Sequence, residues 1–158
     1  MSRINGWPYD MHRIDFRVPF GVTERWRFTT GGNAPHPVHV HGTSFQVVSR
    51  TGGRGRTFPW EGGWKDTVLL NDTGTVEILI RFDKFRGAYD GRYLIHCHQL
   101  EHEDMGMMSN FGRGLGRPGP AVRPARASTP RGALRIHLPR REARACRAAS
   151  SSAGVPVG

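Results

Sequence analysis

Residues 94–108 carry most of the side chains in this sequence that could do chemistry, and they read L-I-H-C-H-Q-L-E-H-E-D-M-G-M-M. The centre of the stretch is His96-Cys97-His98. If these residues form a strand, successive side chains point to opposite faces of the sheet. His96 and His98 then share one face, and Cys97 lies on the other. The spacing therefore predicts two metal sites on one strand, one built from imidazoles and one from a thiolate.

Two side chains that follow Cys97 extend the thiolate site. His102 comes five residues after Cys97, and Met107 comes ten residues after it. A soft thiolate, imidazoles and a weak thioether at a long axial distance are the ligands of a blue copper site. Met105 and Met108 are the alternative thioethers. This ligand set needs one more histidine.

An earlier stretch, H-P-V-H-V-H-G over residues 36–42, supplies more imidazoles. His39 and His41 are two residues apart, so on a strand they share a face. His36 is separated from them by Pro37 and can point elsewhere. The stretch therefore offers one histidine for the thiolate site and two for the imidazole site.

The order and spacing of the two motifs, H-P-x-H-x-H-G and H-C-H-x-x-x-H-x-x-x-x-M, resemble the copper-binding signature of the multicopper oxidases. Three more segments are similar to the C-terminal domain of bacterial laccases, bilirubin oxidases and copper-efflux oxidases. They are I-N-G-x-x-x-D-M-x-R-I-D (4–15), G-W-K-D-T-V (63–68) and L-E-H-E-D-x-G-M-M (100–108). The resemblance covers roughly residues 4–111.

The resemblance implies two copper sites. A complete type 1 site would contain His36, Cys97, His102 and Met107. Half of a three-copper cluster would contain the type 2 ligand His39 and the type 3 ligands His41, His96 and His98. The alternatives are a buried structural thiol at Cys97 and histidines that are structural or bind zinc.

The reaction implied by the resemblance is the one-electron oxidation of a small reducing substrate. Candidates are phenols, aromatic amines, bilirubin-like pigments and cuprous ion, and the acceptor is dioxygen, which takes four electrons to become water. Electrons would leave Cys97 through the backbone to His96 or His98. Cys97 is therefore a candidate catalytic residue as well as a ligand.

Two carboxylates are candidates for supporting roles. Glu103 matches the position at which bacterial members of the family place a carboxylate in the oxygen channel, where it would supply protons. The alternative is a solvated acidic patch with Glu101 and Asp104. Asp66, in the W-K-D motif, either supports a ligand imidazole or caps a loop.

The implied cluster is only half present. In the family, eight histidines hold the three coppers, and four of them lie in two H-x-H motifs of an earlier cupredoxin domain. This sequence has only His12 and His137 to spare, and neither is in such a pair. We therefore expect the chain to be a C-terminal piece of a longer oxidase, completed by N-terminal cupredoxin domains or by a partner chain. The alternative is a stand-alone copper-binding, electron-transfer cupredoxin without oxidase turnover.

The positive charge is unevenly distributed. The net charge of +10 comes almost entirely from residues 113–158, which hold ten arginines and one acid, whereas residues 1–112 hold 13 basic and 12 acidic side chains. The basic segment has no aromatic side chain for stacking on bases, so specific nucleic-acid binding is not expected. Because it cannot bury enough apolar surface to offset its ordering entropy, we predict a disordered tail over 113–158.

The remainder, residues 1–112, is expected to be one all-β domain. Seven or eight short strands separated by turn signals favour an antiparallel sandwich, and the resemblance narrows it to a cupredoxin-like Greek-key barrel. The predicted strands are 9–18, 22–30, 38–46, 47–50, 65–70, 75–82, 92–98 and 105–111. The predicted core contains Trp26, Phe28, Phe45, Val47, Val68, Leu70, Ile78, Ile80 and Tyr93.

Other classes of protein are disfavoured. A cupin also uses H-x-H but wants a glutamate about four residues later, where this sequence has Phe45 and Gln46. No apolar run is long enough to cross a bilayer, and the first 20 residues contain no secretory signal. The sequence does not define the localisation, although the resembled family is usually periplasmic or secreted. With only Cys97 and Cys146, no disulfide framework is implied.

Overall fold

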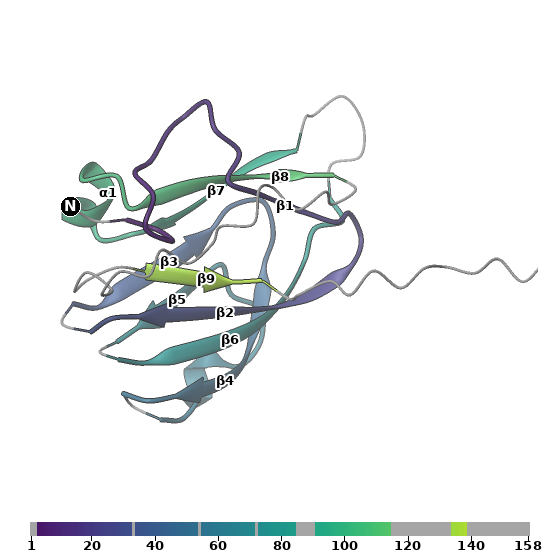
Figure 1. Cartoon of the computed structure of the whole chain (residues 1–158). Coiled ribbons are helices and arrows are strands. Elements are labelled where there is room, and N and C mark those ends of the chain that lie inside the picture. The colour runs from purple at the N-terminus through teal and green to yellow at the C-terminus, as the bar shows by residue number, and fades with distance from the viewer. Residues whose placement is uncertain are drawn as a thin grey trace, which may run out of the picture.

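The described residues form two sheets that pack face to face in a computed structural model of the chain (Figure 1). The strand predicted over 9–18 is limited to Phe16–Val18, and the strand predicted over 38–46 is His36–Val40. The structure describes residues 3–32, 34–53, 55–71, 73–84, 91–114 and 134–138. The expected all-β sandwich is confirmed. The helices in the described residues are one turn of α-helix, α1 (Leu100–Asp104), and one turn of 3-10 helix, η1 (Pro59–Glu61). No helix among these residues is long and apolar enough to cross a membrane.

The first sheet carries both histidine motifs, and its strands lie in the order β1-β8-β7-β3-β5. β1 pairs with β8 in parallel, whereas the other pairs in this sheet are antiparallel. The sheet contains β1 (Phe16–Val18), β3 (His36–Val40), β5 (Thr67–Leu70), β7 (Arg92–Cys97) and β8 (Met108–Arg113). Both motifs therefore lie on adjacent central strands.

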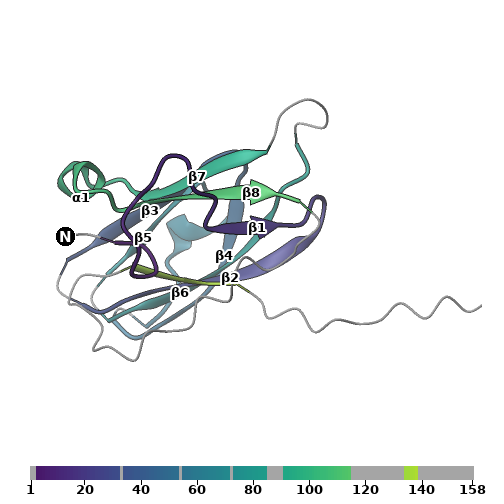
Figure 2. The ribbon, with the colours of Figure 1, turned by 45° about the horizontal axis from the view of Figure 1, so that its top comes forward.

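The second sheet is antiparallel and has the order β4-β6-β2-β9. It contains β2 (Thr23–Thr30), β4 (Phe45–Thr51), β6 (Thr75–Arg81) and β9 (Leu134–His137). Figure 2 shows this sheet beneath the first one, with α1 at one end of the sandwich. The second sheet covers the inner face of the first one and keeps water away from it.

Alternating side chains from the two sheets fill the core. Trp26 is fully buried, and its indole N–H donates to the carboxylate of Glu24, 3.1 Å away, so the polar group of this large side chain is satisfied. All but one of the predicted core residues are buried, and the exception is Val47. Val47 is partly buried and packs against the core, and the register of β4 shifts directly after it, between Val47 and Ser49.

β9 lies within the segment predicted to be disordered, so that prediction is wrong for Leu134–His137. These residues extend the second sheet along the free edge of β2, with Leu134 and Ile136 facing the core. The side-chain amide oxygen of Asn5 accepts a hydrogen bond from the backbone N–H of Ile136 at 2.7 Å. An alternating L-R-I-H segment is enough to cover a sheet edge that would otherwise be exposed. Apart from Leu138, which packs against the core, the rest of the predicted tail beyond Gly114 lies outside the described residues.

Gly42 ends the first histidine motif, and the approach of β7 makes glycine necessary there. Its φ is +87°, and a Cβ placed on it would lie 2.3 Å from two ring atoms of Tyr93, a buried side chain of β7. Gly63 has a similar φ of +77°, but a Cβ there would meet nothing within 4 Å. The two glycines therefore share backbone strain and differ in steric contact.

Gly42→Ala is expected to destabilise the fold much more than Gly63→Ala. In the control, Gly63→Ala, the only cost is that of placing alanine in the left-handed backbone conformation, about 1 kcal/mol. Gly42→Ala adds overpacking against Tyr93, for a total of about 3 kcal/mol. Urea unfolding monitored by Trp fluorescence measures both. Equal losses in the two variants would contradict the close packing of Gly42 on β7.

Candidate metal centres

The register between β3 and β7 places the two motifs side by side. Val38 is opposite Cys97, and His39 is opposite His96. Because side chains alternate along each strand, the sheet presents different donors on its two faces. Cys97 lies on the inner face with His36, and both are fully buried. The two H-x-H pairs, His39 with His41 and His96 with His98, lie on the outer face.

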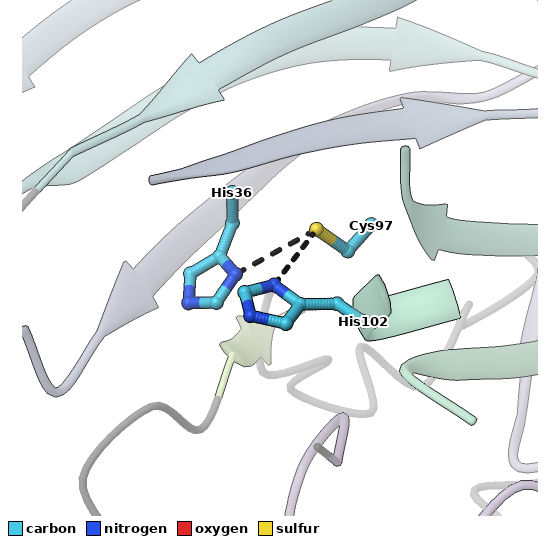
Figure 3. Close-up of side chains that lie close together, drawn as sticks. All are labelled: His36, Cys97 and His102. Atoms are coloured by element: carbon cyan, nitrogen blue, oxygen red, sulfur yellow. Dashed lines mark hydrogen bonds between the residues drawn. The ribbon is translucent and has the colours of Figure 1, made fainter. Parts of the chain in front are cut away.

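The inner group consists of His36, Cys97 and His102 (Figure 3). The sulfur of Cys97 lies 3.6 Å from Nδ1 of His36 and 3.6 Å from Nδ1 of His102. The two imidazole rings are 4.9 Å apart between centres. These separations are short enough for one ion to bond the sulfur and both nitrogens at once.

The loop that follows Cys97 brings the ring of His102 to the sulfur and the backbone of Met107 to the backbone of Cys97. The backbone N–H of Met107 donates to the carbonyl of His102 at 2.9 Å, and the backbone N–H of Cys97 donates to the carbonyl of Met107 at 3.1 Å. Gly106, with a φ of +82°, allows the chain to reverse after α1. Met107 is fully buried, whereas Met105 is half exposed. Of these two thioethers, Met107 is thus the buried one.

The inner group suits a soft metal ion. Burial, and secondarily the neighbouring His102, lower the pKa of His36 to about 4, so its imidazole is neutral, as a ligand must be. Burial raises the pKa of the Cys97 thiol, so the thiolate needs a nearby cation to form. Nε2 of His36 is buried and has no hydrogen-bond partner among the described residues. The ring is therefore held at its other nitrogen, Nδ1, which faces the sulfur.

The outer group is an array of four imidazoles. Nε2 of His41 lies 3.1 Å from Nε2 of His96, and the ring of His39 is centred 4.8 Å from that of His41. One donor nitrogen from each of these three residues lies within 4.8 Å of the others. The ring of His98 is centred 5.3 Å from that of His96 but does not join this closest set. Burial lowers the pKa of His96, so this ligand candidate is also neutral near pH 7.

The two predicted carboxylates lie near the outer group rather than the inner one. A carboxylate oxygen of Glu103 is 3.5 Å from Nδ1 of His96. The carboxylate of Asp66 is 3.9 Å from Nδ1 of His39, which is instead 3.1 Å from the main-chain oxygen of Asp66.

Thr67 is closer to His39 than either oxygen of Asp66, because its hydroxyl lies 2.9 Å from Nδ1. Sequence reasoning missed Thr67. The available signal was its place directly after Asp66 in the W-K-D-T motif, at the start of a strand that would have to pair with the histidine strand.

A two-sheet sandwich with buried Cys97 and His36 on adjacent strands, and His102 beside them from α1, is typical of the cupredoxin class. Residues 1–114 match the family model described as multicopper oxidase. The match covers most of the chain, and the chain belongs to the multicopper oxidase family.

Individual relatives agree with this assignment. The chain is 42% identical over 103 residues to a bilirubin oxidase of Albifimbria verrucaria, covering 63% of this chain and 17% of the relative. It is 39% identical over 109 residues to a laccase of Haloferax volcanii, covering 68% of this chain and 18% of that laccase. A crystal structure of a multicopper oxidase from Pediococcus acidilactici superposes with a TM-score of 0.62 at 35% identity, covering 72% of this chain and 25% of that one. The chain thus spans less than a fifth of the length of these two curated relatives.

The buried imidazole makes the stability of the metal-free chain depend on pH. The folded-state pKa of His36 is lowered from 6.5 to about 4, so the unfolded chain binds a proton more readily. The contribution of neutral His36 to the free energy of unfolding is complete above pH 6.5 and is lost as the pH falls toward 4. The total loss is on the order of 3 kcal/mol. Urea unfolding at a series of pH values in the presence of a chelator measures this loss.

Because other groups titrate in the same range, the informative quantity is the difference between variants. His36→Gln is expected to flatten the pH dependence, whereas His12→Gln, at an exposed position, is expected to leave it unchanged. Parallel pH profiles for the unmodified chain and His36→Gln would contradict the assignment.

Proposed function

We propose that this chain is a copper-binding domain of a multicopper oxidase that couples one-electron oxidation of a small reducing substrate to reduction of dioxygen. The observation that supports this most directly is the division of donors on β7, with Cys97 facing the inner histidines and His96 facing the outer ones. Thiolate with imidazoles suits type 1 copper, and imidazoles alone suit the other copper types.

Each ligand has a separate role in the proposal. His36, Cys97, His102 and Met107 hold the type 1 site, and His39, His41, His96 and His98 hold half of the type 2 and type 3 cluster. Copper at these positions would supply one-electron oxidation of the substrate and four-electron reduction of dioxygen to water. Single peptide bonds join Cys97 to His96 and to His98, so the shortest covalent connection between the two groups is this backbone.

The surroundings of the inner ligands favour the approach of substrate at His102. His36 and Cys97 are fully buried and Met107 is enclosed, whereas His102 is partly exposed at the end of the sandwich. His102 is therefore the inner ligand that a phenol or a related small reductant can approach. Phenols, aromatic amines, bilirubin-like pigments and cuprous ion all remain within this class of reductant.

Glu103 is proposed as the proton donor. Its carboxylate lies 3.5 Å from Nδ1 of His96 and is partly buried, so it is adjacent to the outer group, where dioxygen would be reduced. Reduction of dioxygen to water consumes protons, and a carboxylate at this position can pass them from solvent. Glu101 and Asp104, its acidic neighbours, are exposed and have no such contact in the described residues.

The outer group needs a second protein surface to become a closed site. Its histidines lie on a sheet face, and His41 and His98 are exposed. We infer that a further cupredoxin domain, in the same polypeptide or in a partner chain, contributes the other histidines. A stand-alone electron-transfer cupredoxin is the second candidate, favoured by the fact that the inner group is contained entirely in this chain.

Optical spectroscopy tests the inner site. The copper-loaded chain is expected to show an intense blue thiolate-to-copper band, and Cys97→Ser should abolish it because serine removes the thiolate. Ser49→Ala, on the other sheet, is a control that should keep the band. A folded chain that binds copper without this band would contradict the type 1 assignment.

Oxygen consumption distinguishes the two candidates. The copper-loaded chain alone is expected to sustain no turnover with a phenol. Residues 1–114 grafted in place of the matching segment of the Haloferax volcanii laccase should restore oxygen uptake, and His39→Ala in the graft should abolish it. A blue graft that never consumes oxygen would instead support the electron-transfer cupredoxin.

A further inference from the structure

The Nδ1 atom of His39 has two oxygen neighbours. One belongs to Thr67, the first residue of β5, and the other to Asp66, the residue before β5. The hydroxyl of Thr67 lies 2.9 Å away, and the main-chain oxygen of Asp66 lies 3.1 Å away. The cause is the strand register, since His39 and Thr67 are directly opposite each other on β3 and β5. Opposed residues of an antiparallel pair project their side chains side by side on the same face. The contact therefore follows from the sheet itself and not from a flexible loop.

A third contact determines which way these hydrogen bonds run. The hydroxyl of Thr67 lies 3.0 Å from a carboxylate oxygen of Asp66. An ionised carboxylate can only accept hydrogen bonds, and a hydroxyl has only one proton to donate. Thr67 therefore donates to Asp66, and its oxygen accepts from His39. Both hydrogen bonds, from His39 to Thr67 and from Thr67 to Asp66, can form only if Nδ1 of His39 carries the proton.

The main-chain oxygen of Asp66 requires the same arrangement. A carbonyl cannot donate, so a lone pair on Nδ1 of His39 would face another acceptor at 3.1 Å. Both neighbours thus select the tautomer with hydrogen on Nδ1 and a lone pair on Nε2. His96, which is opposite His39 on β7, follows the same rule, because its Nδ1 lies 3.2 Å from the carbonyl of Cys97. Nε2 of His96 is then free to face Nε2 of His41.

We propose that Thr67, polarised by the carboxylate of Asp66, is a positioning residue that fixes the tautomer and ring orientation of His39. The hydroxyl and carboxylate keep the Nε2 lone pair directed at the outer group. The metal-binding consequence rests on the proposed function, whereas the tautomer itself does not. Removing such a partner from a ligating histidine typically weakens metal binding about 10- to 100-fold.

Long-range ¹H–¹⁵N NMR of the metal-free chain reads the tautomer directly. His39 is expected to carry its proton on Nδ1 in the unmodified chain. Thr67→Val keeps the shape but removes the hydroxyl, and Asp66→Asn removes the fixed acceptor of that hydroxyl, while the main-chain oxygen of residue 66 stays beside Nδ1 in both variants. Both should therefore raise the fraction of the Nε2–H form above that of the unmodified chain. An unchanged Nδ1–H tautomer in Thr67→Val would show that the carbonyl alone sets it and would overturn the role of Thr67. Thr67→Ser should restore the original tautomer, and Thr29→Val, a hydroxyl loss on the other sheet, should not change it. An Nε2–H tautomer in the unmodified chain would overturn the proposal.

Copper binding provides the second readout. Cu²⁺ is titrated into the chain carrying Cys97→Ser, which removes the thiolate site, and binding to the outer histidines is followed by electron paramagnetic resonance. Thr67→Val is expected to weaken binding by about 10-fold, with recovery in Thr67→Ser. If His39→Ala weakens binding and Thr67→Val does not, Thr67 has no positioning role. If the outer histidines bind no Cu²⁺ at all, the proposed function fails, and the NMR result alone decides the tautomer.

Discussion

The alternation of side chains at the end of β7 is the constraint on which both candidate sites depend. The consecutive residues His96 and Cys97 place an imidazole and a buried thiol on opposite faces. The two groups of donors are therefore close in sequence and separated by the thickness of a sheet. A slip of one residue in the register would exchange the faces. The pairing of Val38 with Cys97 and of His39 with His96 prevents this, because the apolar side chains of both strands must remain in the core.

The two groups lie in different environments, and this difference accounts for their different chemistry. The inner donors are closed off by the second sheet and by the loop that returns Met107 to the strand. Such a pocket keeps His36 neutral and excludes water, which suits an ion that exchanges electrons without binding substrate directly. The outer imidazoles form an open array on a sheet face. In the proposed function, another surface would supply the further ligands that close this array.

Much of this arrangement could be predicted because its signals are local. Two H-x-H pairs on strands define a shared face by periodicity alone, and the spacing of His102 and Met107 after Cys97 is short enough for one tight loop. Interactions between segments distant in sequence were harder to predict. β9 is four residues in an arginine-rich segment, and only the free edge of β2 makes it a strand. Thr67 becomes a neighbour of His39 through the β3–β5 register. Each of these depends on tertiary pairing rather than on local pattern.

Anomalous diffraction at the copper edge tests the central claim most directly, because it locates metal relative to β7. Crystals of the copper-loaded chain are predicted to show one peak on the inner face, bonded to the sulfur of Cys97 and to Nδ1 of His36 and His102. A separate peak is predicted on the outer face, beside His39, His41 and His96. Copper confined to the outer face, with the sulfur of Cys97 left unbonded, would contradict the account.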